Sequence, residues 1–277
     1  MRYRPRSGPR LLGMVFLLLA GLPLPGRAEP GFSQDIPRGL RPAVPQIAII
    51  IDDMGRSEAE GQRVIALPGP LACAFLPLEA YSHELAEQAH FAGKEVILHQ
   101  PMQTMAARPL DRGGMTLDMD KNSLRQQLLS NLARVPYVIG INNHMGSLLT
   151  QHPGHMAWVM ELLKERGGLF FIDSRTTKKT VARQLAYENG LPSTSRDVFL
   201  DADNTEAGVR EQWARLIRLA REQGSAIAIA HPHDYTLRVL EEKLARLDSA
   251  RIRLVPVSAL VQQQYVRDSS WRLSLSH

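Results

Sequence analysis

Residues that bind metals or transfer protons follow several short apolar runs of this sequence. Because the carboxyl ends of parallel strands gather at one edge of an α/β sheet, where active sites lie, we expect these side chains to share one site. Aspartate and histidine are also the residue types that hold catalytic divalent metals. The runs and the residues that follow them are Ile47–Ile51 with Asp52 and Asp53, Glu95–Leu98 with His99, Tyr137–Ile141 with Asn142, Asn143 and His144, Leu169–Ile172 with Asp173, and Ala226–Ala230 with His231 and His233.

Asp52 and Asp53 are adjacent carboxylates directly after an apolar run. Two carboxylates cannot both stay ionised in a dry pocket without a compensating charge, which a metal ion supplies. One could bind the metal while the other acts as a base toward a water molecule. The alternative is that the pair forms a turn or caps the next helix, which Gly55 and Ser57 would suit. The histidines that follow the other runs favour the metal.

His99 and His144 are the predicted partners of Asp53 in a metal site. Neutral imidazole is the commonest protein ligand for metals. Two histidines and one carboxylate leave coordination positions open, which suits a catalytic Zn²⁺ or another divalent ion. Asn142 and Asn143 precede His144. Either asparagine could hold a ligand in place or bind substrate, and turn geometry is the alternative.

His231 follows an unbroken apolar run and is the predicted general acid, because a histidine oriented by an aspartate at such an edge suits that role. Asp173 could orient a histidine, or it could pair with Arg175 as plain structure. His233 is either a substrate contact or a surface histidine. Asp201 follows another predicted strand, where it either lines the pocket or caps a helix.

The first 28 of the 277 residues are typical of a secretory signal peptide, with a basic start and an apolar run, Leu11–Leu24, too short to span a bilayer comfortably. An uncleaved anchor is the alternative. Removing the five arginines of residues 1–28 from the 33 basic residues leaves 28, which equals the 28 acidic residues. The positive charge therefore gives no support for a nucleic-acid partner. Cys73 is the only cysteine, so no internal disulfide can form. We expect a periplasmic or secreted bacterial protein.

Apolar runs alternate with helix-like segments from Gln46 onward, which predicts a mostly parallel α/β sheet. Residues 29–45 are a proline-rich linker, 46–265 a single domain, and 266–277 a polar tail. The number of strands favours a distorted (β/α) barrel over a doubly wound sheet, and no Gly-x-Gly-x-x-Gly follows the first strand. The predicted strands are 46–51, 71–76, 95–99, 137–141, 169–172, 197–200, 225–230 and 252–255. The predicted helices are 57–67, 81–92, 121–134, 152–166, 176–189, 205–223, 235–247 and 257–265.

The order of these motifs resembles the polysaccharide deacetylases, and most of all their divergent branch of exported bacterial proteins. The resemblance covers residues 46–261 and rests on Ile-Ile-Asp52-Asp53-Met-Gly, Leu-His99-Gln-Pro-Met, Gly-Ile-Asn-Asn-His144-Met-Gly-Ser, Phe-Ile-Asp173-Ser and Ala-His231-Pro. It implies a distorted (β/α) barrel. It also implies Asp52 as the catalytic base, a metal held by Asp53, His99 and His144, and His231 as the general acid oriented by Asp173. Asn143, Arg175 and His233 are the remaining predicted site residues, as substrate contacts.

The resemblance implies a metal-dependent hydrolase, with Zn²⁺ the favoured ion, that removes acetyl groups from an N- or O-acetylated carbohydrate such as a cell-envelope glycan. The chain departs from the usual family pattern, because only one histidine follows the third strand and the segments Arg-Pro-Pro-Tyr and Asp-x-x-Asp-Trp are absent. A second hypothesis is therefore a non-catalytic glycan-binding or cell-envelope scaffold protein. A third is a phosphoester hydrolase, which the single mixed Asp/His site disfavours because such enzymes often use metal pairs.

Overall fold

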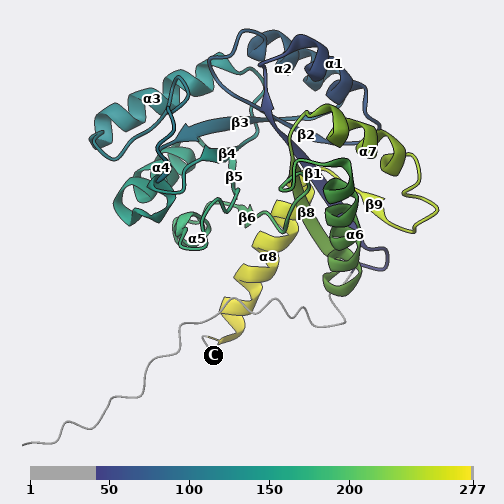
Figure 1. The fold of residues 1–277 in the computed structure, drawn as a ribbon. Helices are drawn as coiled ribbons and strands as arrows, with labels where there is room; N and C mark the ends of the chain where they lie inside the picture. The colour runs from purple at the N-terminus through teal and green to yellow at the C-terminus, as the bar shows by residue number, and fades with distance from the viewer. Residues whose placement is uncertain (1–41, 276–277) are drawn as a thin grey trace, which may run out of the picture. The chain divides into compact units, whose positions relative to one another are not determined.

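The protein is an α/β fold built on one curled sheet of parallel strands (Figure 1). The computed structural model describes residues 42–275, with side chains up to 267, and these belong to one compact unit. The predicted signal at 1–28 and most of the linker lie outside the described residues. The strands are β1 Gln46–Met54, β2 Ala72–Phe75, β3 Glu95–Met102, β4 Gly140–Met145, β5 Phe170–Asp173, β6 Ser193–Ser195, β7 Val198–Phe199, β8 Ser225–Ala230 and β9 Arg253–Leu254. The helices are α1 Glu58–Ala66, α2 Ser82–Phe91, α3 Lys121–Arg134, α4 Pro153–Arg166, α5 Ala182–Glu188, α6 Glu206–Gln223, α7 Asp234–Leu244 and α8 Val257–Leu275, with a short 3-10 turn, η2, at Leu149–Gln151.

The sheet curls because its two edge strands are neighbours in the sequence. Its order is β6-β5-β4-β3-β2-β1-β8-β7, with β9 paired to β1. Only Arg196 and Asp197 separate β6 at one edge from β7 at the other. The Arg196 N–H donates to the Asp173 carbonyl at 3.0 Å, and the Asp197 N–H donates to the Ile227 carbonyl at 2.9 Å. One short segment therefore bonds to both edges, which confirms the predicted distorted barrel.

The two faces of the sheet bury different sets of side chains, as the alternation along each strand requires. In β1, Ile47, Ile49 and Ile51 belong to an outer cluster of buried apolar side chains that packs against the surrounding helices. Ala48 and Ile50 belong to an inner cluster inside the barrel. The inner cluster is filled by the start of α8, which Figure 1 shows in yellow. Its members from α8 are Val257, Leu260 and Val261.

The elements differ from the prediction mainly in where they end. β1, β3 and β4 run three or four residues past their predicted ends, to Met54, Met102 and Met145, so the site residues lie within the strands. The predicted strand 197–200 corresponds to β7, and β6 just before it was not predicted because Ser-Thr-Ser carries no apolar signal. α5 begins at Ala182 rather than 176. α8 continues to Leu275 through the predicted polar tail.

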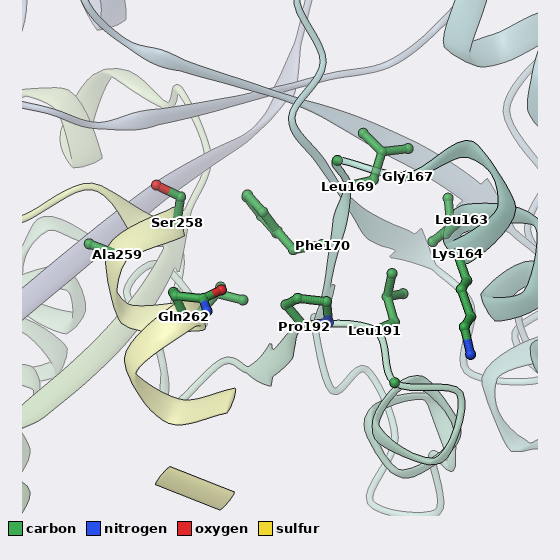
Figure 2. A pocket seen from close by; sticks show the side chains of 13 residues that line it. Leu163, Lys164, Gly167, Leu169, Phe170, Leu191, Pro192, Ser258, Ala259 and Gln262 are labelled. Atoms are coloured by element: carbon green, nitrogen blue, oxygen red, sulfur yellow. The ribbon is translucent and has the colours of Figure 1, made fainter. Parts of the chain in front are cut away.

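A cavity of about 570 Å³ opens at the end of the barrel where the strands begin (Figure 2). Phe170, the first residue of β5, lies between Gln262 of α8 and Leu191, which precedes β6. The cavity is therefore at the opposite edge from the predicted site. Within the described residues, no helix combines the length and apolar content that a membrane crossing needs.

Candidate metal centre and acid–base pair

A local irregularity in β1 brings Asp52 and Asp53 to the same site. Strict alternation would point adjacent residues to opposite faces of the sheet. The pairing of β1 with β2 shifts register between Ile51 and Met54, and Asp53 has a φ of 57°, in the left-handed region. A non-glycine residue held there is strained, and such strain concentrates at functional sites. Ser57, not the aspartate pair, caps α1 by accepting the Glu60 N–H, so both carboxylates are free for other roles.

Asp53, His99 and His144 form a triangle of ligand atoms. Oδ1 of Asp53 lies 3.3 Å from His99 Nε2 and 3.0 Å from His144 Nδ1, and the two ring nitrogens are 3.0 Å apart. Ligand atoms that share one ion at about 2.0–2.2 Å lie about 3 to 3.5 Å from one another. Oδ1 of Asp53 is buried and has no hydrogen-bond partner among the described residues. The donor set, its spacing and this unsatisfied oxygen all fit a divalent metal.

Charge at the centre is distributed unevenly between the two aspartates. Burial raises the pKa of Asp52, although His99, His231 and the hydrogen bond from Asn142 oppose the rise. For Asp53, burial is outweighed by the ring nitrogens of His144 and His99, so its pKa lies well below the ordinary value. Asp53 therefore stays ionised and would supply the negative charge of a metal site. Asp52, with its raised pKa, has the chemistry of a general base.

Asn142 connects the metal triangle to the predicted base. Its Oδ1 lies 2.7 Å from His99 Nδ1, which leaves Nε2 of that ring directed at the triangle. Its Nδ2 donates to Asp52 Oδ1 at 2.7 Å. Asn142 is fully buried. One side chain therefore fixes both a ligand ring and the carboxylate, which is how outer-shell residues usually tune metal sites.

His144 is flanked on its other side by Asp111, which was not predicted as a site residue. Asp111 Oδ2 lies 2.7 Å from His144 Nε2, although this ring nitrogen is not aligned for a hydrogen bond to it. The same oxygen accepts from Arg56 at 3.0 Å. Asp111 lies in the loop of residues 103–120. The length of this loop was the only sequence signal that could have pointed to Asp111, because long loops in compact domains usually have a function.

His231 is oriented by Asp201, and the prediction that Asp173 orients it is wrong. His231 Nδ1 lies 3.1 Å from Asp201 Oδ1, while Asp201 Oδ2 accepts the His231 backbone N–H at 2.6 Å and the Thr236 hydroxyl at 3.0 Å. Alternation explains the difference. Phe171 belongs to the outer cluster, so Asp173, two residues later, is on the outer side. Phe199 packs against the inner cluster, so Asp201 is on the inner side with His231.

Asp173 and Asn143 hold strand ends together. Asp173 accepts from the Arg175 N–H at 2.8 Å and from the Thr180 hydroxyl at 2.9 Å. Asn143 accepts the Ser174 N–H at 2.9 Å, and its amide donates to the Met145 carbonyl at 2.8 Å. Both side chains are buried, so the predicted contact of Asn143 with substrate is replaced by a structural role.

Arg175 and His233, the other predicted substrate contacts, are exposed at this edge. Arg175 follows β5 with a φ of 49°. The His233 ring is stacked beside that of His231, with centroids 5.7 Å apart. Asp201, His231 and His233 could also hold an ion. Because Asp201 already has three contacts, with the His231 ring, the His231 backbone N–H and the Thr236 hydroxyl, it is less available to a second metal. The arrangement instead favours Asp201 and His231 as an acid–base pair.

Arg196 is a site residue that the sequence did not reveal. It lies between β6 and β7, and its guanidinium is over the Phe199 ring at 5.0 Å. Its Nε donates to the Ser174 carbonyl at 2.8 Å. Burial lowers the pKa of Arg196, whereas the negative charge of Asp52 acts in the opposite direction. Without a predicted strand at 193–195, nothing placed this arginine at the site.

Comparison with known proteins finds bacterial relatives with similar sequences and a solved structure with the same fold. The chain is 39% identical over 225 residues to the uncharacterized protein YibQ of Escherichia coli K12, covering 81% of this chain and 70% of YibQ. It is 37% identical over 221 residues to an uncharacterized protein of Haemophilus influenzae, covering 80% and 78%. A crystal structure of the uncharacterized protein ATU2773 of Agrobacterium tumefaciens has the same fold, with a TM-score of 0.73 and 24% identity over 78% of this chain and 89% of that one.

The family model described as divergent polysaccharide deacetylase matches residues 49–261. This range holds every member of the metal triangle, the acid–base pair and the barrel strands apart from the first three residues of β1. The chain therefore belongs to the divergent polysaccharide deacetylase family.

Proposed function

We propose that the protein is an exported, metal-dependent hydrolase that removes acetyl groups from an N- or O-acetylated carbohydrate. The observation that carries the proposal is the metal triangle beside a base with a raised pKa and a charged histidine. The family assignment supports the substrate class. Zn²⁺ is the favoured ion because two imidazoles and one carboxylate leave a fourth position open.

The protein side chains divide the chemistry between them. Asp53, His99 and His144 would hold the ion, which when bound supplies a Lewis acid that activates water and polarises the acetyl carbonyl. Asp52 accepts the proton of the attacking water. His231 donates a proton to the leaving amine or alcohol, since the His231 pKa of about 9 keeps it charged near neutral pH. Asn142 holds the carboxylate of Asp52 and the ring of His99 in fixed positions through its two hydrogen bonds.

Export is part of the proposal and rests on the sequence of residues 1–28. A basic start followed by a short apolar run is the composition that secretion machinery recognises. The balanced charge of the remaining chain agrees with a carbohydrate partner better than with a nucleic acid. An acetylated glycan of the cell envelope would then be the accessible substrate.

The first test measures bound metal by elemental analysis, with His144→Ala as the variant and His90→Ala as the control. We expect about one equivalent of a divalent ion in the wild type and in the control, and loss of that ion in His144→Ala. His90 is an exposed histidine of α2 away from the triangle. A wild type that holds no metal and takes up no added Zn²⁺ would exclude the hydrolase and leave a glycan-binding scaffold.

The second test separates the base from the ligands. Asp52→Asn should keep its metal and its hydrogen bond to Asn142, and lose at least about 10²-fold in the rate of acetate release. Asp53→Asn should instead lose metal, because it removes the charged ligand. Near-full activity of Asp52→Asn on an acetylated glycan would exclude this residue as the base.

A further inference from the structure

A groove of about 640 Å³ lies between the start of α2 and the end of α3. It is lined by the segment after β2, the start of α2, the loop 103–120 and the end of α3. Segments that follow β2 and β3 belong to the carboxyl edge of the sheet, where the candidate site is. The lining residues are Pro77, Leu78, Glu79, Ala80, His83, Arg112, Ser130, Ala133 and Arg134.

Two arginines of this groove have no partner for their charge. Neither Arg112 nor Arg134 makes a side-chain hydrogen bond or ion pair within the part of the chain that the structure describes, and both are exposed. Some other arginines of the described residues are paired, for example Arg63 with Asp234 and Glu241. An unpaired guanidinium offers several donors in a fixed planar fork.

The remaining polar residues leave the groove positive. Glu79 is its one carboxylate, against two guanidinium groups. His83 adds a ring whose Nδ1 lies 3.3 Å from the Arg134 carbonyl oxygen, and whose Nε2 is 3.8 Å from Glu87 at the surface. Ser130 supplies a hydroxyl. Guanidinium groups recognise carboxylates and phosphates through paired, charge-assisted hydrogen bonds.

One residue that lines the groove, Arg112, is next in sequence to a residue that contacts the metal centre. Arg112 follows Asp111, whose carboxylate is 2.7 Å from the ligand His144. Consecutive Cα atoms are about 3.8 Å apart. The backbone of Arg112 is therefore near enough to the centre for a neighbouring sugar unit of a bound glycan to reach its side chain. Unlike the cavity in Figure 2, this groove is lined in part by segments that follow β2 and β3, at the carboxyl edge of the sheet.

We propose that this groove, through Arg112 and Arg134, binds an anionic group on the glycan, so that the substrate is an acidic acetylated polysaccharide rather than a neutral one. The inference rests on the proposed function, because it names the substrate class of the same site. The anion is a carboxylate or a phosphate on a sugar unit next to the one that loses its acetyl group. Neutral acetylated oligomers would bind at the metal centre alone.

The test compares three N-acetylated oligosaccharides of equal length: a neutral tetramer of N-acetylglucosamine, one with a neighbouring uronic acid, and one with a phosphate ester. Wild type, Arg112→Ala/Arg134→Ala and Arg166→Ala are each assayed for acetate release. We expect kcat/KM of the double variant to fall on the order of tenfold for each arginine removed, mainly through a higher KM. The fall should be seen with the uronic acid or with the phosphate ester, whichever anion the groove recognises. Activity on the neutral tetramer should not change. The preference of the wild type for charged over neutral oligosaccharides should weaken as salt is added.

Arg166→Ala is the matched control, because Arg166 is also an exposed arginine in the last turn of a helix, α4, at the other edge of the sheet. Calorimetric binding of the same three oligosaccharides to Asp52→Asn tests the groove without turnover. Equal binding of neutral and charged oligomers, or charged binding unaffected by the double variant, overturns the inference. Absence of acetate release from every oligomer, with charged binding still dependent on the two arginines, overturns the proposed function alone.

Discussion

The charge of His231 depends most on Asp201, the carboxylate to which its ring is hydrogen-bonded. Burial would lower the pKa of this ring, but the hydrogen bond to Asp201 and the charges of Asp52, Asp201 and Asp53 outweigh burial and raise it to about 9. Asp201→Asn keeps the shape and removes the charge. We expect the His231 pKa to fall by at least one unit in that variant, toward the ordinary value of about 6.5. Titration of the imidazole by NMR in metal-free protein measures it.

The same shift predicts how stability depends on pH. Because the His231 pKa is raised on folding, the charged ring stabilises the fold fully below about pH 6.5, and this contribution is lost as pH rises through about 9. Denaturation of metal-free protein at pH 6 and pH 9.5 should therefore show a smaller loss for Asp201→Asn than for the wild type. If stability falls equally in both proteins between pH 6 and pH 9.5, Asp201 does not set the pKa of His231.

Asp111 is expected to strengthen metal binding without touching the ion. Its carboxylate lies against the ring nitrogen of His144 that faces away from the triangle. A carboxylate beside a ligand ring favours the bound cation through its charge, and the loss of such outer-shell partners typically weakens metal affinity about 10- to 100-fold. Competition with a chromogenic chelator should show this loss for Asp111→Asn. Asp118→Asn, an exposed aspartate in the same loop, serves as the control and should bind metal like the wild type.

Among the strands and helices, the features that follow a regular sequence pattern could be predicted, and those that break the pattern could not. The apolar runs predicted the parallel strands, and their order predicted the metal triangle. Strand alternation was sufficient to choose Asp201 over Asp173, but that step requires knowing which face is inside. The bulge at Asp53 and the strand at 193–195 depend on tertiary contacts, so no local pattern revealed them.

The turn after β1 is an element whose conformation the site requires. Gly55 has a φ of 104°, and a Cβ there would collide with the hydroxyl of Ser82. Gly55→Ala should therefore destabilise the fold by about 1–3 kcal/mol and disturb the neighbouring aspartates. Gly93→Ala is the matched control, because Gly93 has a φ of 75° with nothing near the added carbon. Urea denaturation should place Gly93→Ala between the wild type and Gly55→Ala.

Across the whole molecule, stability and chemistry belong to opposite ends of the barrel. The strands carry the metal triangle at their carboxyl ends, while the start of α8 fills the inner cluster near their amino ends. The barrel is narrow there, since Ala48, Ala72 and Ala74 line it. A side chain lost from α8 therefore leaves a cavity that its small neighbours cannot fill.

Leu260→Ala tests this separation. Leu260 is fully buried in the inner cluster, and truncating such a leucine costs about 2–5 kcal/mol of unfolding free energy. Because Leu260 is in the part of α8 near the amino ends of the strands, and the metal triangle is at their carboxyl ends, we expect metal affinity to stay within about twofold of the wild type while the protein is folded. Chemical denaturation and chelator competition on the same preparation measure both quantities. A large loss of metal affinity at unchanged stability would mean that α8 positions the centre directly.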